Sequence, residues 1–196
     1  MAADRGPTAI VRQLETSITD AIRGRDRVIL AYSGGLKSTL IAMIARKRCD
    51  LTCIVAGTEG SADVEAGKRA KQHLDYRLET ILLDSAIVQE IDRRLRADHP
   101  RLTNGERHDL IPVFAVLQVA GGEPIIAGFA GTLRASSQSV LDLTQVAVPL
   151  HVATEKGRML NRQLRAAALE LGLPPSWANV RHRDPLDGAG IRKFLG

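Results

Sequence analysis

The residues best suited to chemistry form one short glycine-containing segment, Ser33-Gly34-Gly35-Leu36-Lys37-Ser38. Glycine has no Cβ atom to keep a phosphate away from the backbone, and it allows dihedral angles that turn successive N–H groups to one side. The hydroxyls of Ser33 and Ser38 can donate hydrogen bonds to phosphate oxygens, and Lys37 adds a positive charge. The segment therefore predicts a loop that holds the phosphates of a nucleotide, and ATP is the expected ligand.

The elements expected on either side of this loop support the interpretation. Residues 28–32 are a continuous apolar run, as in a strand buried on both faces, and residues 39–45 have the pattern of a helix. A strand before the loop and a helix after it are what phosphate binding by backbone N–H groups and a helix dipole requires. The spacing differs from GxxxxGK[ST] and from GxGxxG, so neither of these nucleotide-binding motifs is present.

The strand–loop–helix pattern recurs along the chain and predicts an α/β fold. We expect a doubly wound, mostly parallel sheet with helices on both faces, because alternating strands and helices form right-handed crossovers. Short apolar runs between turn residues mark the strands, which are expected at residues 28–32, 51–56, 76–83 and 124–128.

Apolar residues at helical spacing mark the helices. A leading amphipathic helix is expected over residues 8–22, ending near Gly24. Ser61 is the expected N-cap of the helix that follows the second strand. Further helices are expected over residues 84–95, 110–119 and 154–171, and a loop over residues 129–138.

Length and composition favour a single domain. A chain of 196 residues with 44% hydrophobic residues can bury one core, so residues 1–196 are expected to form one domain, with a leading helix in 1–24 and a C-terminal helical segment in 154–196. No stretch has the apolar length of a membrane helix or a signal peptide, so a cytoplasmic protein without a membrane partner is expected. The basic residues behind the net charge of +5 are scattered among acids, so nucleic acid is not expected as the main partner.

Ser33–Ser38 resembles the SGGxDS signature of the PP-loop ATP pyrophosphatases, which are adenine nucleotide alpha-hydrolase-like proteins, and four of the five fixed positions agree. Residues 57–63, followed by Ala66, Ala70 and Leu74, resemble the stretch after the second strand in the synthetase domain of asparagine synthetases. The tail of that domain is similar to four further segments of this chain, at residues 164–167, 171–174, 181–183 and 187–191.

The resemblance implies a nucleotide-binding fold and cleavage of ATP between its α and β phosphates. In that family a carboxylate substrate becomes an acyl-adenylate, which ammonia then converts to an amide. The positions that would contact pyrophosphate are Ser33, Gly34, Gly35 and Ser38, and those near adenosine are Ala31, Val55 and Gly128. Arg183 falls where the family has a lysine beside the phosphates, so Lys37 and Arg183 are the candidate catalytic cations.

Two departures from the family pattern bear on metal binding. The aspartate of SGGxDS is Lys37 here, and the acidic residues of the loop after the fourth strand are replaced by Phe129, Thr132 and Leu133. Magnesium at nucleotide phosphates is normally held through one or two carboxylates, so a Mg²⁺ cofactor beside ATP stays an open question. Glu59 and Asp63, after the second strand, are the candidate metal ligands.

Three functions therefore remain open. The first is an asparagine-synthetase-like ligase that forms AMP, with ammonia from solution or from a separate glutaminase, because the chain begins with the leading helix. The second is a catalytically degenerate nucleotide-binding protein that serves as a regulator or subunit, which the chemistry of Lys37 and Phe129 favours. The third is a tRNA-modifying PP-loop enzyme, although the paired catalytic cysteines of that branch are missing. A homodimer is also expected.

Overall fold

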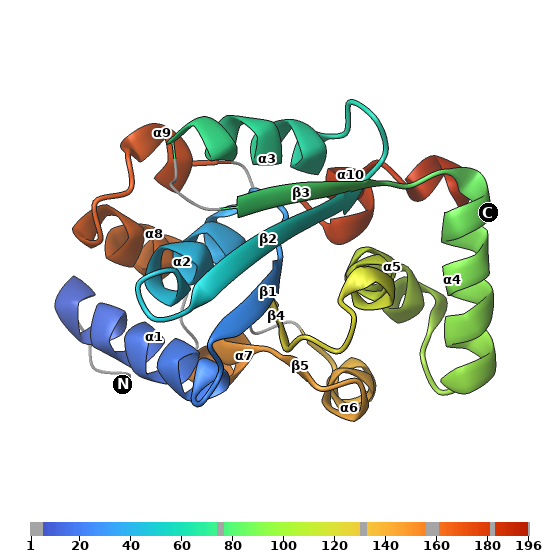
Figure 1. Ribbon diagram of the computed structural model, residues 1–196, viewed down its shortest axis with the longest axis horizontal. Helices are drawn as coiled ribbons and strands as arrows, with labels where there is room; N and C mark the ends of the chain where they lie inside the picture. Colours follow the sequence, from blue (N-terminus) through green and yellow to red (C-terminus); the bar gives the residue numbers. More distant parts are fainter. Residues whose placement is uncertain (1–5, 74–76, 130–132, 156–160, 181–182, 196) are drawn as a thin grey trace.

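The computed structural model describes residues 6–73, 77–129, 133–155, 161–180 and 183–195. Within these residues, five strands form one sheet in the order β3-β2-β1-β4-β5, and every neighbouring pair is parallel (Figure 1). The expected α/β fold with a doubly wound parallel sheet is therefore confirmed. The strands are β1 (Arg27–Ala31), β2 (Asp50–Gly57), β3 (Arg77–Leu82), β4 (Ile125–Ala127) and β5 (Val146–Ala147).

Helices cover both faces of the sheet. The helices whose apolar side chains pack on the first face, together with Leu30, Cys53 and Val55 of the strands, are α1 (Pro7–Ile22), α2 (Leu36–Ala45), α3 (Ala62–His73), α7 (Pro149–Glu155) and α8 (Asn161–Glu170). The helices that pack on the second face, together with Ile29, Ile54 and Ala127, are α4 (Ser85–Asp98), α5 (Asn104–Val119) and α6 (Ala135–Leu143).

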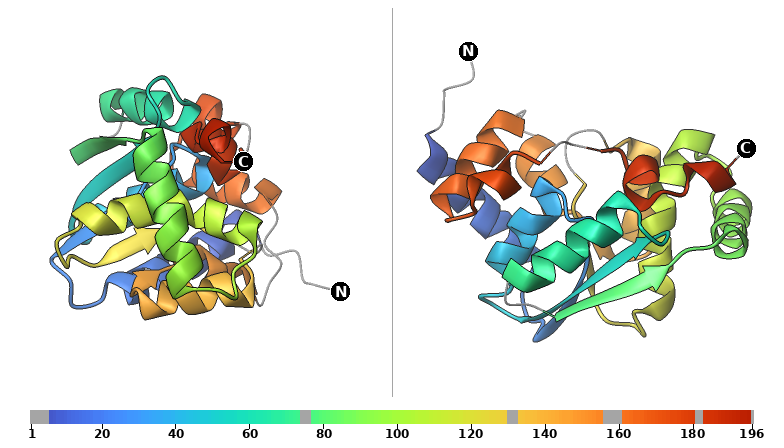
Figure 2. Two further views of the ribbon diagram at one scale, coloured as in Figure 1. Left: turned by 90° about the vertical axis from the view of Figure 1, so that its right-hand side faces the viewer. Right: turned by 90° about the horizontal axis from the view of Figure 1, so that it is seen from above.

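The two cores follow from the alternation of side chains along each strand. In β2, Val55 belongs to the first core, whereas its neighbours Ile54 and Ala56 belong to the second. The short elements near the C-terminus are α9 (Pro175–Ala178), α10 (Pro185–Ala189) and the 3₁₀ turn η1 (Arg192–Phe194). Helix α10 contacts both α3 and α5, so it joins the two layers beyond the ends of the strands (Figure 2).

Most strands and the leading helix lie where the sequence predicts them, within one or two residues. Helix α2 begins earlier than expected, at Leu36, so the second half of the phosphate-loop segment is its first turn. Helix α6 occupies part of the predicted loop 129–138, and its apolar signal is weak because few of its residues are buried. The single helix predicted over 154–171 is represented by α7 and α8, which flank residues outside the described part.

Helix starts differ in how they are capped. Asp84 caps α4, since its carboxylate accepts the Ile87 N–H at 2.8 Å. The Ser61 carbonyl accepts the Glu65 N–H at 3.0 Å, but the Ser61 hydroxyl is buried and has no hydrogen-bond partner among the described residues. Ser61 therefore precedes α3 without capping it through its side chain. None of the described helices is both long and apolar enough to cross a membrane.

Candidate functional site

A cavity of about 380 Å³ opens at the carboxyl ends of β1, β2 and β4. The connections after β1 and β2 run over the first face, through α2 and α3, whereas the connection from β3 to β4 runs over the second face, through α4 and α5. The winding direction therefore changes between β1 and β4, which is where open α/β sheets bind ligands. The strand residues at the base of the cavity are small or apolar: Ala31, Ile54, Ala56, Ala127 and Gly128.

The segment between β1 and α2 forms the first wall of this cavity. Gly34 has a φ of +69°, and a Cβ atom there would overlap the Cβ atom of Ala66 in α3. Both the backbone angle and the close packing of α3 therefore require glycine at this position. Gly35 is the N-cap of α2, and no side chain caps the helix.

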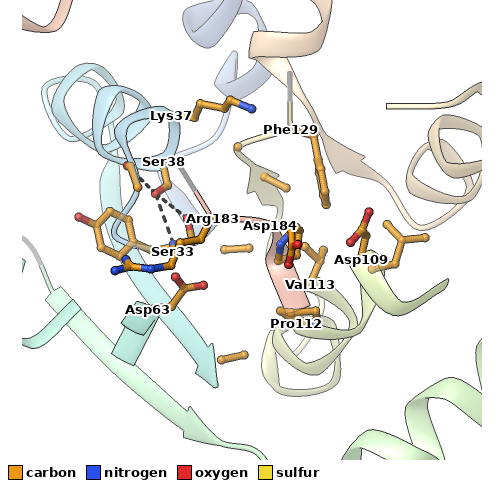
Figure 3. A pocket seen from close by; sticks show the side chains of 18 of the residues that line it. Ser33, Lys37, Ser38, Asp63, Asp109, Pro112, Val113, Phe129, Arg183 and Asp184 are labelled. Atoms are coloured by element: carbon orange, nitrogen blue, oxygen red, sulfur yellow. Dashed lines mark hydrogen bonds between the residues drawn. The ribbon is translucent and has the colours of Figure 1, made fainter. Parts of the chain in front are cut away.

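Hydrogen bonds between the serines keep the loop in a tight turn (Figure 3). The Ser38 hydroxyl donates to the Gly35 carbonyl at 3.1 Å and accepts the Ser33 N–H at 3.3 Å, while the two hydroxyl oxygens lie 3.3 Å apart. The first N–H groups of a helix have no partner within it, so those of Leu36, Lys37 and Ser38 are available to an anion in the cavity. A Cβ atom on Gly128 would lie 3.2 Å from the Ser38 nitrogen, so glycine there leaves room beside it.

Positive side chains line the cavity. Lys37 is half-buried, and burial lowers the pKa of its amine. Arg183 lies beside Asp63 (Figure 3). Arg134 and Arg165 also line the cavity, and the sequence reasoning missed both. The Nε atom of Arg165 is buried and has no hydrogen-bond partner within the described residues.

Asp63, in the first turn of α3, is the candidate metal ligand that reaches the cavity. Burial raises the pKa of its carboxyl to about 7, although the charge of Arg183 acts in the opposite direction. A Cβ atom on Gly188 would lie 2.5 Å from the Asp63 Oδ1 atom, so the carboxylate packs closely against the α10 backbone. Near neutral pH this acid is therefore partly protonated.

Glu106 of α5 is an acid in the cavity that sequence reasoning did not find. It forms a capping box with Thr103, whose hydroxyl donates to its carboxylate at 2.6 Å. The hydroxyls of Ser136 and Ser137 also donate to Glu106, and the bonds from Ser136 and Thr103 lower the pKa of its carboxyl to about 2. Its oxygens are therefore already occupied. The pattern Thr-x-x-Glu at 103–106 is a sequence signal for this cap.

Asp109 and Asp184 face the cavity from α5 and from the start of α10. Asp184 accepts the Asp187 N–H at 2.8 Å and pairs with Arg192 at 3.0 Å. Asp109 has no hydrogen bond or ion pair within the described residues, and burial together with the nearby Asp184 raises the pKa of its carboxyl. No sequence pattern marks either residue, because their meeting depends on how α10 packs on α5.

The structure brings most of the predicted site residues together but separates two. Those that line the cavity are Ala31, Ser33, Gly34, Gly35, Lys37, Ser38, Asp63, Gly128 and Arg183. Val55 does not, because strand alternation turns its side chain into the first core and directs Ile54 and Ala56 toward the cavity instead. Glu59 lies in an exposed turn outside the cavity. Both placements correct the sequence-based expectation.

The described residues of the cavity offer few free carboxylate oxygens to a magnesium ion. Among the described residues, no three His, Cys, Asp or Glu side chains are grouped so that they could hold a metal. Lys37 occupies the loop, and Phe129 and Leu133 line the cavity after β4. Mg²⁺ bound to phosphates needs oriented carboxylate oxygens, and Glu106 and Asp184 already bind other groups.

Two of the similarities to known proteins bear on this site, and no family model matches the chain. The chain is 32% identical over 79 residues to "Putative asparagine synthetase (glutamine-hydrolyzing) 1" of Methanocaldococcus jannaschii, which covers 40% of this chain but only 15% of that protein. The structure of NMN synthetase from Francisella tularensis superposes with a TM-score of 0.56 and 16% identity, covering 93% of this chain and 78% of the other. The second similarity shows a shared fold.

Proposed function

Because both similarities support the resemblance to the PP-loop ATP pyrophosphatases, we propose that this chain binds an adenine nucleotide whose phosphates lie at residues 33–38. The observation that carries the proposal is the N-terminus of α2, which has no side-chain cap and lies at the cavity. It follows Gly34, where the close packing of α3 leaves no room for a side chain. Helix N-termini with free N–H groups bind phosphates through both hydrogen bonds and the helix dipole.

The remainder of the cavity suits a nucleoside. Its base is apolar and is continued by Leu110, Pro112, Val113 and Val116 of α5. A cavity of about 380 Å³ lies within the range of small-molecule sites, roughly 300–1,000 Å³. The adenine and ribose would therefore lie against β1, β4 and α5, with Lys37 and Arg183 beside the phosphates.

We favour a nucleotide-binding protein without turnover over a ligase. Cleavage between the α and β phosphates develops charge that a metal normally neutralises, and the described residues of the cavity include no group of three metal-binding side chains. The name of the curated relative favours the ligase as the second candidate, with ammonia or a separate glutaminase as the nitrogen source. A thiol-dependent, tRNA-modifying activity is less well supported, because neither Cys49 nor Cys53 lines the cavity.

Calorimetry with ATP, AMP and pyrophosphate tests the binding site. We expect dissociation constants in the micromolar to millimolar range, roughly −4 to −8 kcal/mol. Gly34→Ala introduces both backbone strain and a clash with Ala66, so we expect binding at least about tenfold weaker. Gly24→Ala is the matched control, because Gly24 has a φ of +71° but open space around it. No heat and no thermal shift with any of the three ligands would refute the proposal.

A turnover assay separates binding from ligation. With ATP, Mg²⁺, aspartate and ammonia, we expect no steady release of pyrophosphate, because the charge at position 37 is reversed relative to the family. Pyrophosphate and AMP are measured together over many protein equivalents. Steady, Mg²⁺-dependent AMP formation would refute the proposal of a binding protein without turnover and would support the ligase.

A further inference from the structure

We propose that the site binds its nucleotide as the metal-free polyphosphate anion, with Lys37, Arg165 and Arg183 providing the positive charge. The inference rests on the proposed function, since it assumes a nucleotide with its phosphates at residues 33–38. It concerns which form of the nucleotide is bound, ATP⁴⁻ or its magnesium complex.

The carboxylates of the cavity leave few oxygens for a divalent cation. Glu106 accepts hydrogen bonds from three hydroxyls, and Asp184 caps α10 and pairs with Arg192. Asp63 lies beside Arg183 and packs against Gly188. Asp63 and Asp109 have no hydrogen bond or ion pair within the described residues, and they come from helices on opposite faces of the sheet, α3 and α5.

Two of the cavity cations, in contrast, have no acidic partner in the part of the chain that the structure describes. Neither Lys37 nor Arg165 forms an ion pair among the described residues, whereas the arginines on the surface of α4 pair with Glu90 and Asp92. The buried Nε atom of Arg165 has no acceptor within the described parts of the chain. A buried donor without an acceptor is costly, so an anionic ligand that reaches Arg165 recovers that cost.

The position of Lys37 adds a second electrostatic argument. It lies in the first turn of α2, where the helix dipole is positive and no acidic side chain compensates. A lysine is unfavourable at this end of a helix, and burial adds to the cost. A phosphate bound at the loop reverses both effects, because it pairs with the amine and with the dipole. A magnesium ion at the same phosphates would instead be repelled by Lys37.

The charges of the two forms of ATP predict which form the site binds more tightly. Free ATP carries about four negative charges near neutral pH and its magnesium complex about two, so the positive charges of Lys37, Arg165 and Arg183 favour the free form. We therefore expect ATP to bind about threefold to tenfold more tightly in EDTA than in excess Mg²⁺ at matched ionic strength.

The decisive experiment is calorimetry of the full chain with ATP in EDTA and in excess MgCl₂. Tighter binding in EDTA supports the inference. Binding that strengthens tenfold or more with Mg²⁺, by about 1.4 kcal/mol, overturns it and leaves the proposed function intact. Absence of binding under both conditions refutes the proposed function itself.

Charge reversal at Lys37 provides a second readout. Lys37→Asp should weaken metal-free binding at least about tenfold and remove the inhibition by Mg²⁺. Lys47→Asp makes the same charge change at an exposed position just beyond the other end of α2, so it should bind as the wild type does. Unchanged metal-free affinity in a folded Lys37→Asp protein would contradict the inference. Circular dichroism of both variants establishes that they are folded.

Discussion

Lys37 stands in the first turn of α2, at the position where the PP-loop signature has aspartate. Arg165 and Arg183 line the same cavity, which therefore holds further positive charge for an anionic ligand. An isolated Asp-to-Lys change would leave the other metal ligands in place. Here the acids that the family has after β4 are also absent, and Phe129 and Leu133 line the cavity instead. Several positions of the site therefore differ from the family pattern together.

Asp63 makes a pH-dependent contribution to stability. Its carboxyl has a pKa of about 7 in the folded chain, against about 3.9 in an unfolded chain. The folded state therefore keeps this proton over a range in which the unfolded state has lost it, and the free energy of unfolding falls as the pH rises from about 4 to about 7. Above about pH 7 the contribution of Asp63 to the free energy of unfolding no longer changes with pH.

We predict that Asp63→Asn removes this pH dependence. The stability of the variant relative to the wild type should rise between about pH 4 and about pH 7 and then level off, measured by urea unfolding at a series of pH values. Asp26→Asn, at an exposed carboxylate, should show no such trend. Parallel curves for Asp63→Asn and wild type would contradict the raised pKa.

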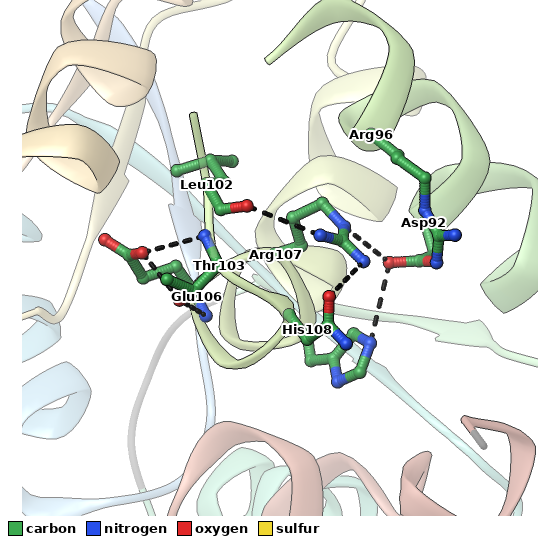
Figure 4. Close-up of polar contacts among 8 residues, drawn as sticks. Asp92, Arg96, Leu102, Thr103, Glu106, Arg107 and His108 are labelled. Atoms are coloured by element: carbon green, nitrogen blue, oxygen red, sulfur yellow. Dashed lines mark hydrogen bonds and ion pairs between the residues drawn. The ribbon is translucent and has the colours of Figure 1, made fainter. Parts of the chain in front are cut away.

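At the scale of elements, α5 provides one wall of the cavity and is held against α4 by a buried ion pair (Figure 4). Arg107 donates through Nε to Asp92 at 3.1 Å, and its other nitrogens donate to the Leu102 carbonyl and to Asn104. Arg96 also contacts Asp92, at 3.1 Å, but its side chain is 66% exposed. The two arginines therefore share one carboxylate from very different environments.

Removing the shared carboxylate of Asp92 should lower the free energy of unfolding far more than removing the exposed side chain of Arg96. Asp92→Ala leaves Arg107 charged and buried without its acid, so we expect a loss of about 3 kcal/mol in the free energy of unfolding. Arg96→Ala breaks an exposed pair and should cost less than about 1 kcal/mol. Denaturant unfolding measures both. Equal losses would mean that Arg107 reaches water once Asp92 is gone.

At the scale of the whole molecule, nucleotide binding should raise the free energy of unfolding. With a dissociation constant of about 10 μM, ATP at about 1 mM stabilises the folded chain by about 2.7 kcal/mol. For a chain of 196 residues this corresponds to a rise of about 5–10 °C in the unfolding midpoint. A thermal scan in EDTA measures it. An unchanged midpoint at saturating ATP would contradict preferential binding to the folded state.

The fold was predictable because its signals are local. Buried parallel strands appear as continuous apolar runs, and the leading helix appears as apolar residues at helical spacing, so β1, β2 and α1 were located within about two residues. Helix α6 and the two-residue β5 were not predicted. Their apolar residues are few, and their conformation depends on packing against α5 and β4.

The sequence by itself determined that a glycine turn between a buried strand and a helix would form a phosphate-sized loop, because that outcome depends on backbone freedom and on neighbouring residues. Only the tertiary structure decided what surrounds the loop. Strand alternation together with helix placement turned Val55 away and Ile54 inward, and the packing of α10 on α5 brought Asp184 beside Asp109. Contacts between residues far apart in the chain depend on how whole layers pack, and no local pattern encodes them.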